Sequence, residues 1–244
     1  ELAEMFPELT AEEREALQRK YGTLHAILEA EEVIRDKAND MLRHYVEHIA
    51  PNGLKAQLVA ISRRAAVRYQ AALVLARDAL VAEAEGLAKA IRELDDLELQ
   101  GKPRKLVAAV RAARQLERLR SLEFAAIISP DNNDPPEWSE WSDAGKMMSR
   151  VDRFKLPFEH KDPQKRDPLA FLIVKSMLLT GFDAPIEGVM YLDRPIREAE
   201  LLQAIARVNR TGHGKTAGIV VDYYGIAKHL KEALTAYSDE DVEG

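Results

Sequence analysis

Residues 171–193 read FLIVKSMLLTGFDAPIEGVMYLD and hold two apolar runs, FLIVKS and GVMYLD, separated by a turn-rich segment. Three similar runs occur elsewhere, at residues 56–62 (AQLVAIS), 124–129 (FAAIIS) and 218–223 (GIVVDY). Continuous Val/Ile/Leu runs separated by helical patterns are typical of strands that are buried on both faces of a parallel sheet. We therefore predict an α/β fold, with ligands bound beyond the carboxyl ends of the strands.

Helical patterns surround these runs. Thr10 and Glu13 form a capping box in the first fifty residues, and a periodic apolar stripe predicts a helix over about residues 23–49. Two further helices are expected between the first two strands, over about residues 65–99 and 103–120. We divide the chain into a helical support segment (1–50), a main domain (51–237) with a helical insertion at about 80–120, and an acidic tail (238–244).

The last of these helices carries four arginines in one narrow sector, namely Arg104, Arg111, Arg114 and Arg118. The plain interpretation is a solvated face above a packed one. The alternative is a ridge that tracks phosphates or docks a partner.

The composition excludes several classes of protein. A hydrophobic content of 46% is enough for a core, and no apolar run approaches the ~20 residues that span a bilayer. Zero cysteines exclude disulfides and cysteine-ligated metal sites. The net charge of -6 argues against an autonomous DNA-binding protein, which usually carries a basic surplus. With no export leader visible, we expect a cytoplasmic protein, and the start at Glu1 suggests an excised fragment.

Two segments carry residues suited to chemistry. After the strand at 171–176, Gly181 allows a tight turn, and Asp183 is expected to present a carboxylate at the carboxyl edge of the sheet. In the helix LLQAIARVNR (201–210), offsets of four and three place Gln203, Arg207 and Arg210 on one face. Two guanidiniums and an amide suit recognition of a polyanion such as a triphosphate.

These segments resemble motifs V and VI of superfamily 2 helicases and translocases. The sequence is similar to that of the R (restriction) subunit of type I restriction–modification enzymes in the segments LLTGFDAP…YLD…LLQAIARVNR…GIVVDYYG. The resemblance covers about residues 52–224. It implies a RecA-like fold, of the type found in P-loop NTPases, and identifies the chain as the second of two motor domains.

The resemblance also implies roles for individual residues. Gly181 and Asp183 would border the ribose side of a cleft between two motor domains, and Gln203 would support that site. Arg207 and Arg210 would reach the γ-phosphate as arginine fingers, which typically contribute ~10³–10⁵ in rate. The residues that would face the DNA backbone are Ser62, Arg63, Lys175, Ser176 and Thr180.

The implied enzyme is an ATP-hydrolysing type I site-specific deoxyribonuclease. Its cofactors would be ATP and Mg²⁺, bound mainly by the first motor domain. Its partners would be double-stranded DNA, the first motor and nuclease domains of the same parent chain, and the modification (methyltransferase) and specificity subunits, with no membrane. The fragment alone is expected to be inactive, because it lacks Walker A, Walker B and nuclease motifs.

Several other patterns are weaker. His44 and His48 match H-x-x-E-H, for which we expect an exposed helical patch instead of a zinc site. Pro130-Asp131 with Glu159-x-Lys161 imitates a PD…ExK nuclease, but a loop rich in proline and tryptophan intervenes. Residues 211–216 (TGHGKT) imitate a phosphate loop that lacks its first glycine and precedes a strand.

Two rival functions remain open. One is the second domain of another superfamily 2 helicase, used in repair or remodelling. The other is a non-catalytic interaction module derived from a motor domain.

Overall fold

The computed structural model describes residues 25–179, 182–196 and 198–224. Five strands form one sheet in the order β2-β3-β1-β4-β5, and every neighbouring pair is parallel. The predicted α/β class, a parallel sheet flanked by helices, is confirmed. In chain order the elements are α3 (Glu31–His48), η1 (Ala50–Asn52), β1 (Lys55–Ala60), α4 (Arg63–Gly86), α5 (Lys89–Arg92), α6 (Arg104–Arg114), α7 (Leu116–Ser121), β2 (Glu123–Ile127), η2 (Pro136–Trp138), α8 (Ser139–Ser142), α9 (Ala144–Lys155), η3 (Pro163–Lys165), β3 (Leu169–Val174), β4 (Glu187–Asp193), α10 (Glu198–Val208) and β5 (Ile219–Asp222).

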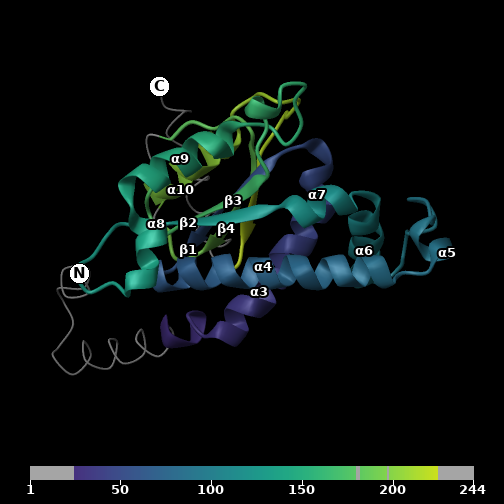
Figure 1. The fold of residues 1–244 in the computed structure, drawn as a ribbon, viewed down its shortest axis with the longest axis horizontal. Helices are drawn as coiled ribbons and strands as arrows, with labels where there is room; N and C mark the ends of the chain where they lie inside the picture. Colours follow the sequence, from purple (N-terminus) through teal and green to yellow (C-terminus); the bar gives the residue numbers. More distant parts are fainter. Residues whose placement is uncertain (1–24, 180–181, 197, 225–244) are drawn as a thin grey trace, which may run out of the picture.

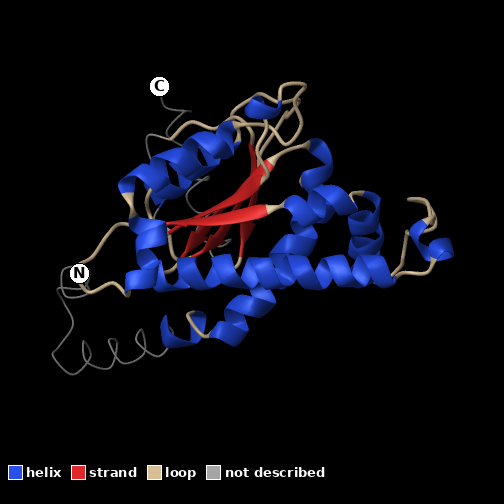
Figure 2. Ribbon diagram, viewed as in Figure 1, coloured by secondary structure: helices blue, strands red, loops and turns tan. Residues whose placement is uncertain are grey.

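The sheet lies between two helical layers, as Figure 2 shows. Helices α3 and α4 cover one face, and α9 and α10 cover the other (Figure 1). All residues of β1, β3 and β4 are buried, whereas the edge strands β2 and β5 are partly exposed. Burial on both faces explains why the sequence reads as continuous apolar runs instead of alternating ones.

Alternate residues of each strand enter two separate cores. On the α3/α4 side, the rings of Phe171 and Tyr191 stack with centroids 5.8 Å apart, and Tyr45 meets Phe171 edge-on at 4.8 Å. On the α9/α10 side, Leu172, Met190 and Leu192 are among the residues that pack with Phe154, Leu201 and Val208. Each face of the sheet thus fixes its own layer of helices.

The N-terminal helix is tied to the sheet through one buried carboxylate. Asp193, the last residue of β4, is fully buried. It accepts hydrogen bonds from Lys37 Nζ and from the hydroxyl of Tyr69, each at 2.5 Å. Because Lys37 lies on α3 and Tyr69 on α4, three elements meet at this carboxylate.

The helical insertion departs from the prediction. The helix expected over 65–99 ends at Gly86, and turns with the short α5 follow it. The helix expected over 103–120 is two helices, because the backbone of Gln115 leaves the helical region (φ -129, ψ 36). The helix expected over 23–49 is interrupted at residues 29–30. The predicted capping box at Thr10 and the acidic tail at 238–244 lie outside the described residues.

The connection from β3 to β4 determines the geometry of the site. Because β4 is parallel to β3, residues 175–186 must return from the carboxyl end of β3 to the amino end of β4, crossing β1. Leu179, Phe182 and Ala184 of this segment pack in the core on the α9/α10 side. In the described ranges, no helix has both the length and the apolar character needed to cross a membrane.

Candidate functional site

The residues predicted to contact DNA cluster at the carboxyl edge of the sheet. Ser62 caps α4, its Oγ accepting a hydrogen bond from the amide of Ala65 at 3.0 Å. Arg63 follows it directly, and Lys175 and Ser176 are exposed just beyond the end of β3. Strands β1 and β3 are neighbours, so these residues share one edge.

This edge is partly closed by internal contacts. The guanidinium of Arg63 pairs with Asp134, lies 3.8 Å from Asp131, and sits 5.7 Å from the ring of Trp138. Arg194 donates a hydrogen bond of 2.9 Å to the carbonyl of Lys175. The cationic surface here is therefore smaller than the sequence suggests, because Arg63 already has acidic partners.

Asp183 is not at the carboxyl edge, and this part of the prediction is wrong. It lies four residues before Glu187, the first residue of β4, and so close to the amino end of that strand. The reason is the return of the chain: the turn at residues 184–187, closed by the bond from the Glu187 amide to the Ala184 carbonyl at 2.9 Å, delivers the backbone directly into β4.

The C-terminal end of α10 meets this segment. Asp183 forms an ion pair with Arg210, and both side chains are at least half exposed, at 62% and 50%. Arg207 is only 6% exposed, and its guanidinium lies 5.8 Å from the ring of Phe182. Burial lowers the pKa of Arg207, against the opposing effect of Glu187. One arginine is therefore presented to solvent and the other is held beneath it.

A second layer of charge lies behind these arginines. Glu187 is fully buried, and burial raises the pKa of its carboxyl to about 8, against the opposing charges of Arg207 and Lys215. The ammonium of Lys215 donates hydrogen bonds to the carbonyls of Glu187 and Val208, the latter at 2.7 Å. Lys215 thus fastens the end of α10 to the start of β4.

Sequence reasoning missed Glu187 and Lys215. The signal available was a glutamate at the head of an apolar run, in the segment PIEGVMYLD. A charged residue almost never lies in a fully buried strand without a partner.

The remaining predicted residues contribute less to this picture. Gln203 is exposed on α10, one turn before Arg207. Thr180 and Gly181 lie outside the described residues. The structure therefore brings Asp183, Arg207 and Arg210 together at the amino side of the sheet, and Ser62, Arg63, Lys175 and Ser176 together at the opposite edge.

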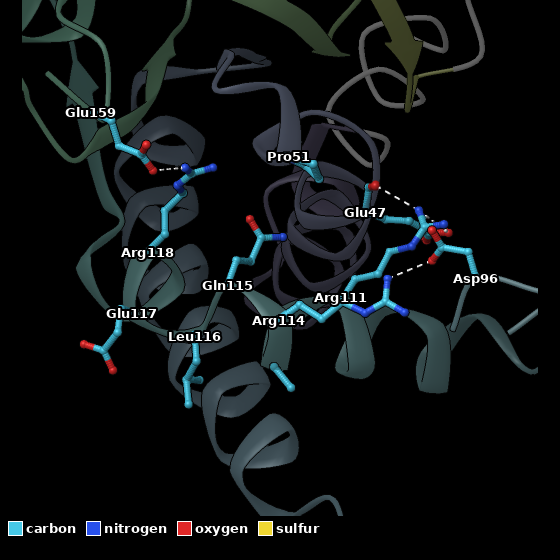
Figure 3. A pocket seen from close by; sticks show the side chains of 11 residues that line it. Glu47, Pro51, Asp96, Arg111, Arg114, Gln115, Leu116, Glu117, Arg118 and Glu159 are labelled. Atoms are coloured by element: carbon cyan, nitrogen blue, oxygen red, sulfur yellow. Dashed lines mark hydrogen bonds and ion pairs between the residues drawn. The ribbon is translucent and has the colours of Figure 1, made fainter. Parts of the chain in front are cut away.

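The arginine-rich face of the insertion packs against α3. Arg104 pairs with Asp40 at 2.9 Å, and Arg111 donates a hydrogen bond of 3.0 Å to the carbonyl of Glu47. A hollow of about 810 Å³ lies beside this face, and Figure 3 shows the side chains that line it. In it Arg114 meets Asp96 at 2.8 Å, and Arg118 pairs with Glu159. These pairings favour a packing role for the arginines over a phosphate-tracking ridge.

The decoy motifs do not assemble. His44 Nδ1 lies 2.8 Å from the hydroxyl of Tyr191, and in the described part of the chain no group of three metal-ligating side chains gathers. Asp131 follows β2, whereas Glu159 lies in the segment that leads into β3 and pairs with Arg118. Lys215 of the TGHGKT stretch binds the chain's own carbonyls.

Comparison with known proteins identifies the family. Residues 137–225 match the model for type I restriction enzyme subunit R domain 3. A type I restriction enzyme endonuclease subunit (HindI) of Haemophilus influenzae is 39% identical over 121 residues, which cover 48% of this chain and 11% of that protein. The predicted resemblance of this chain to a domain of type I restriction enzyme R subunits is thus confirmed.

Two further proteins are similar to this chain. MjaIXP of Methanocaldococcus jannaschii, named as a type I restriction enzyme endonuclease subunit, is 26% identical over 229 residues, or 94% of this chain and 17% of that protein. A solved fragment of an HsdR subunit of a type I restriction enzyme from Vibrio vulnificus is 15% identical, with a TM-score of 0.47, over 82% of this chain and 29% of that one. The chain spans less than a fifth of the length of each of the two named relatives.

Proposed function

We propose that this R-subunit domain is the second motor domain of an ATP-dependent DNA translocase. The observation that carries the proposal is the convergence of Asp183, Arg207 and Arg210 on one side of the sheet. In this proposal Arg207 and Arg210 act on the γ-phosphate of ATP bound to the first motor domain, and Gly181, Asp183 and Gln203 border the nucleotide.

The chemistry of the two arginines fits a triphosphate. Arg210 is exposed, and its carboxylate partner is a surface group that water screens, so an anion can replace it at small cost. Arg207 Nε and Nη1 are buried without a hydrogen-bond partner among the described residues. Unmade hydrogen bonds of a buried charged group are costly, and phosphate oxygens would satisfy them. Bound ATP with Mg²⁺, held mainly by the first motor domain, would supply the phosphoryl group.

The opposite edge would contact DNA in the same proposal. Ser62, Arg63, Lys175, Ser176 and Thr180 would face the backbone of the double strand. The nuclease domain of the same parent chain and the modification and specificity subunits would complete a cytoplasmic type I restriction enzyme. The isolated domain would hydrolyse no ATP.

The test uses a complete R subunit that carries this sequence, assayed for DNA-stimulated ATP hydrolysis. Arg207→Ala and Arg210→Ala are each expected to lower kcat by ~10³-fold or more, as for other arginine fingers. Arg166→Ala, at an exposed arginine in the loop before β3, is the matched control and should retain full turnover. Retained turnover in both test variants refutes the assignment.

A further inference from the structure

Glu187 and Arg207 form a buried pair of opposite charges that is not hydrogen-bonded. Glu187 is 0% and Arg207 6% exposed. Both carboxylate oxygens of Glu187, and Nε and Nη1 of Arg207, are buried without a hydrogen-bond partner among the described residues. The two side chains nevertheless attract each other, since each opposes the effect of burial on the pKa of the other.

Such an arrangement is unusual for a purely structural pair. A buried ion pair generally offsets the cost of desolvation only when good hydrogen bonds accompany the charge attraction. Here Nε and Nη1 of Arg207 stay unbonded although an acceptor carboxylate lies in the same buried cluster. The cluster therefore holds the guanidinium in place while leaving these two donors unused.

The surroundings keep this geometry rigid. Lys215 binds the carbonyls of Glu187 and Val208, which prevents β4 and the end of α10 from separating. Gly212 lies so close to Pro185 that an added Cβ would stand 2.9 Å from the proline Cβ, so the turns on both sides are in contact. The distance between Glu187 and Arg207 is thus set by backbone anchors.

We propose that Glu187 is a positioning residue for Arg207, a buried counter-ion that competes with the phosphate oxygens of a nucleoside triphosphate for this guanidinium. The inference rests on the function proposed above. When Glu187 is ionised, it holds Arg207 inside the domain. When Glu187 is protonated, Arg207 is available to the phosphate.

The titration of Glu187 is set by few neighbours. Arg207 on α10 and Lys215 in the turn before β5 face it and favour its ionised form. Lys55, its register partner on β1, directs its ammonium to the carbonyls of Asp167 and Arg153 instead. Outside the cluster, Asp183 and Arg210 pair with each other. With its pKa at about 8, the carboxyl changes charge close to neutral pH.

The test measures KM for ATP and kcat of DNA-stimulated hydrolysis by the holoenzyme between pH 7 and pH 9. For the unsubstituted enzyme we expect KM to rise about tenfold, because the fraction with protonated Glu187 falls to roughly a tenth at pH 9. In Glu187→Gln, KM should stay constant within about twofold. Glu187→Asp retains a titrating carboxyl, so its KM for ATP should still rise between pH 7 and pH 9. Glu123→Gln, which removes a carboxylate at the amino end of β2, should behave as the unsubstituted enzyme.

The outcomes separate the inference from the proposed function. If Arg207→Ala abolishes turnover while KM of Glu187→Gln rises with pH as before, the positioning role is overturned and the motor function stands. A lower kcat in Glu187→Gln with an unchanged KM profile indicates a structural role and also overturns the inference. If Arg207→Ala and Arg210→Ala both retain turnover, the proposed function fails, and the positioning role of Glu187 fails with it.

Discussion

Replacing Glu187 by glutamine should change how the stability of the chain depends on pH. Burial raises the pKa of the Glu187 carboxyl from 4.5 to about 8. A carboxyl with a raised pKa contributes stability that is fully present below pH 4.5 and is lost as the pH rises through 8. Glutamine has no proton to lose, so the variant escapes this loss.

The size of the effect follows from the shift. Each pKa unit corresponds to about 1.4 kcal/mol. At pH 6 the folded chain keeps the proton that the unfolded chain has lost, and this lowers the free energy of unfolding by roughly 2 kcal/mol relative to low pH. At pH 9 nearly the whole pKa shift contributes, and the free energy of unfolding is lower by roughly 5 kcal/mol. Relative to the unsubstituted chain, Glu187→Gln should therefore gain about 3 kcal/mol in free energy of unfolding between pH 6 and pH 9.

Lys55 provides a control of opposite sign. It is fully buried in β1, and burial lowers its pKa from 10.5 to about 7. The cost of this lysine is fully present below pH 7 and is relieved as the pH rises from 7 towards 10.5. In the unsubstituted chain, the ionisation of Lys55 and that of Glu187 therefore change the free energy of unfolding in opposite directions as the pH rises. Between pH 6 and pH 9, the free energy of unfolding of Lys55→Met should consequently fall relative to that of the unsubstituted chain. The fall should be about as large as the gain expected for Glu187→Gln.

The assay is urea unfolding of the unsubstituted chain and both variants at pH 6 and pH 9, followed by circular dichroism at constant ionic strength. The quantity compared is the difference in free energy of unfolding between variant and unsubstituted chain, because other titrating groups cancel in it. A difference for Glu187→Gln that varies by less than about 0.5 kcal/mol, which is the usual scale of a surface substitution, would refute the buried-carboxyl reasoning.

Three further substitutions, one of them a control, test a buried hydrogen bond and a close contact. Tyr69→Phe removes the hydroxyl that donates to the buried Asp193, and should cost about 1–3 kcal/mol in urea unfolding; an unchanged midpoint would contradict this account of the Asp193 site. Gly218→Ala places a Cβ 2.2 Å from the carbonyl oxygen of Val208 and should destabilise by about 1–3 kcal/mol, whereas Gly86→Ala, with no atom within 4 Å, should be neutral or stabilising by thermal melting. Equal melting temperatures for these two glycine variants would count against the close contact.

All five strands could be predicted from the sequence. Each is a short apolar run such as FLIVKS, and burial on both faces leaves no polar alternation to confuse the pattern. The convergence of Asp183 with Arg210 follows from the resemblance to motifs V and VI and not from helix spacing, because Asp183 precedes β4 and Arg210 follows the end of α10. For the strands, the local pattern and the local fold agree.

What failed depends on non-local packing. The edge at which Asp183 lies is decided by the return path of residues 175–186, which spacing along the chain does not reveal. The pairing of Arg111 and Arg118 with α3 and its neighbours depends on how the insertion folds back. The helix break between α6 and α7 at Gln115 could not be predicted, because no glycine or proline marks it in the sequence. Glu187 was missed because it reads as an ordinary strand-flanking charge.

The parallel strands give the domain a mechanical property. Ser62 and Lys175 lie beyond one end of strands about 20 Å long, and Asp183 and Arg210 lie near the other. Strands that are hydrogen-bonded on both sides and packed on both faces do not compress, so a displacement imposed at one end moves the other as part of the same body. With the roles proposed above, a small rotation of the domain about the nucleotide would displace the DNA-contacting edge at the far end of the strands. The sheet would then act as a stiff lever.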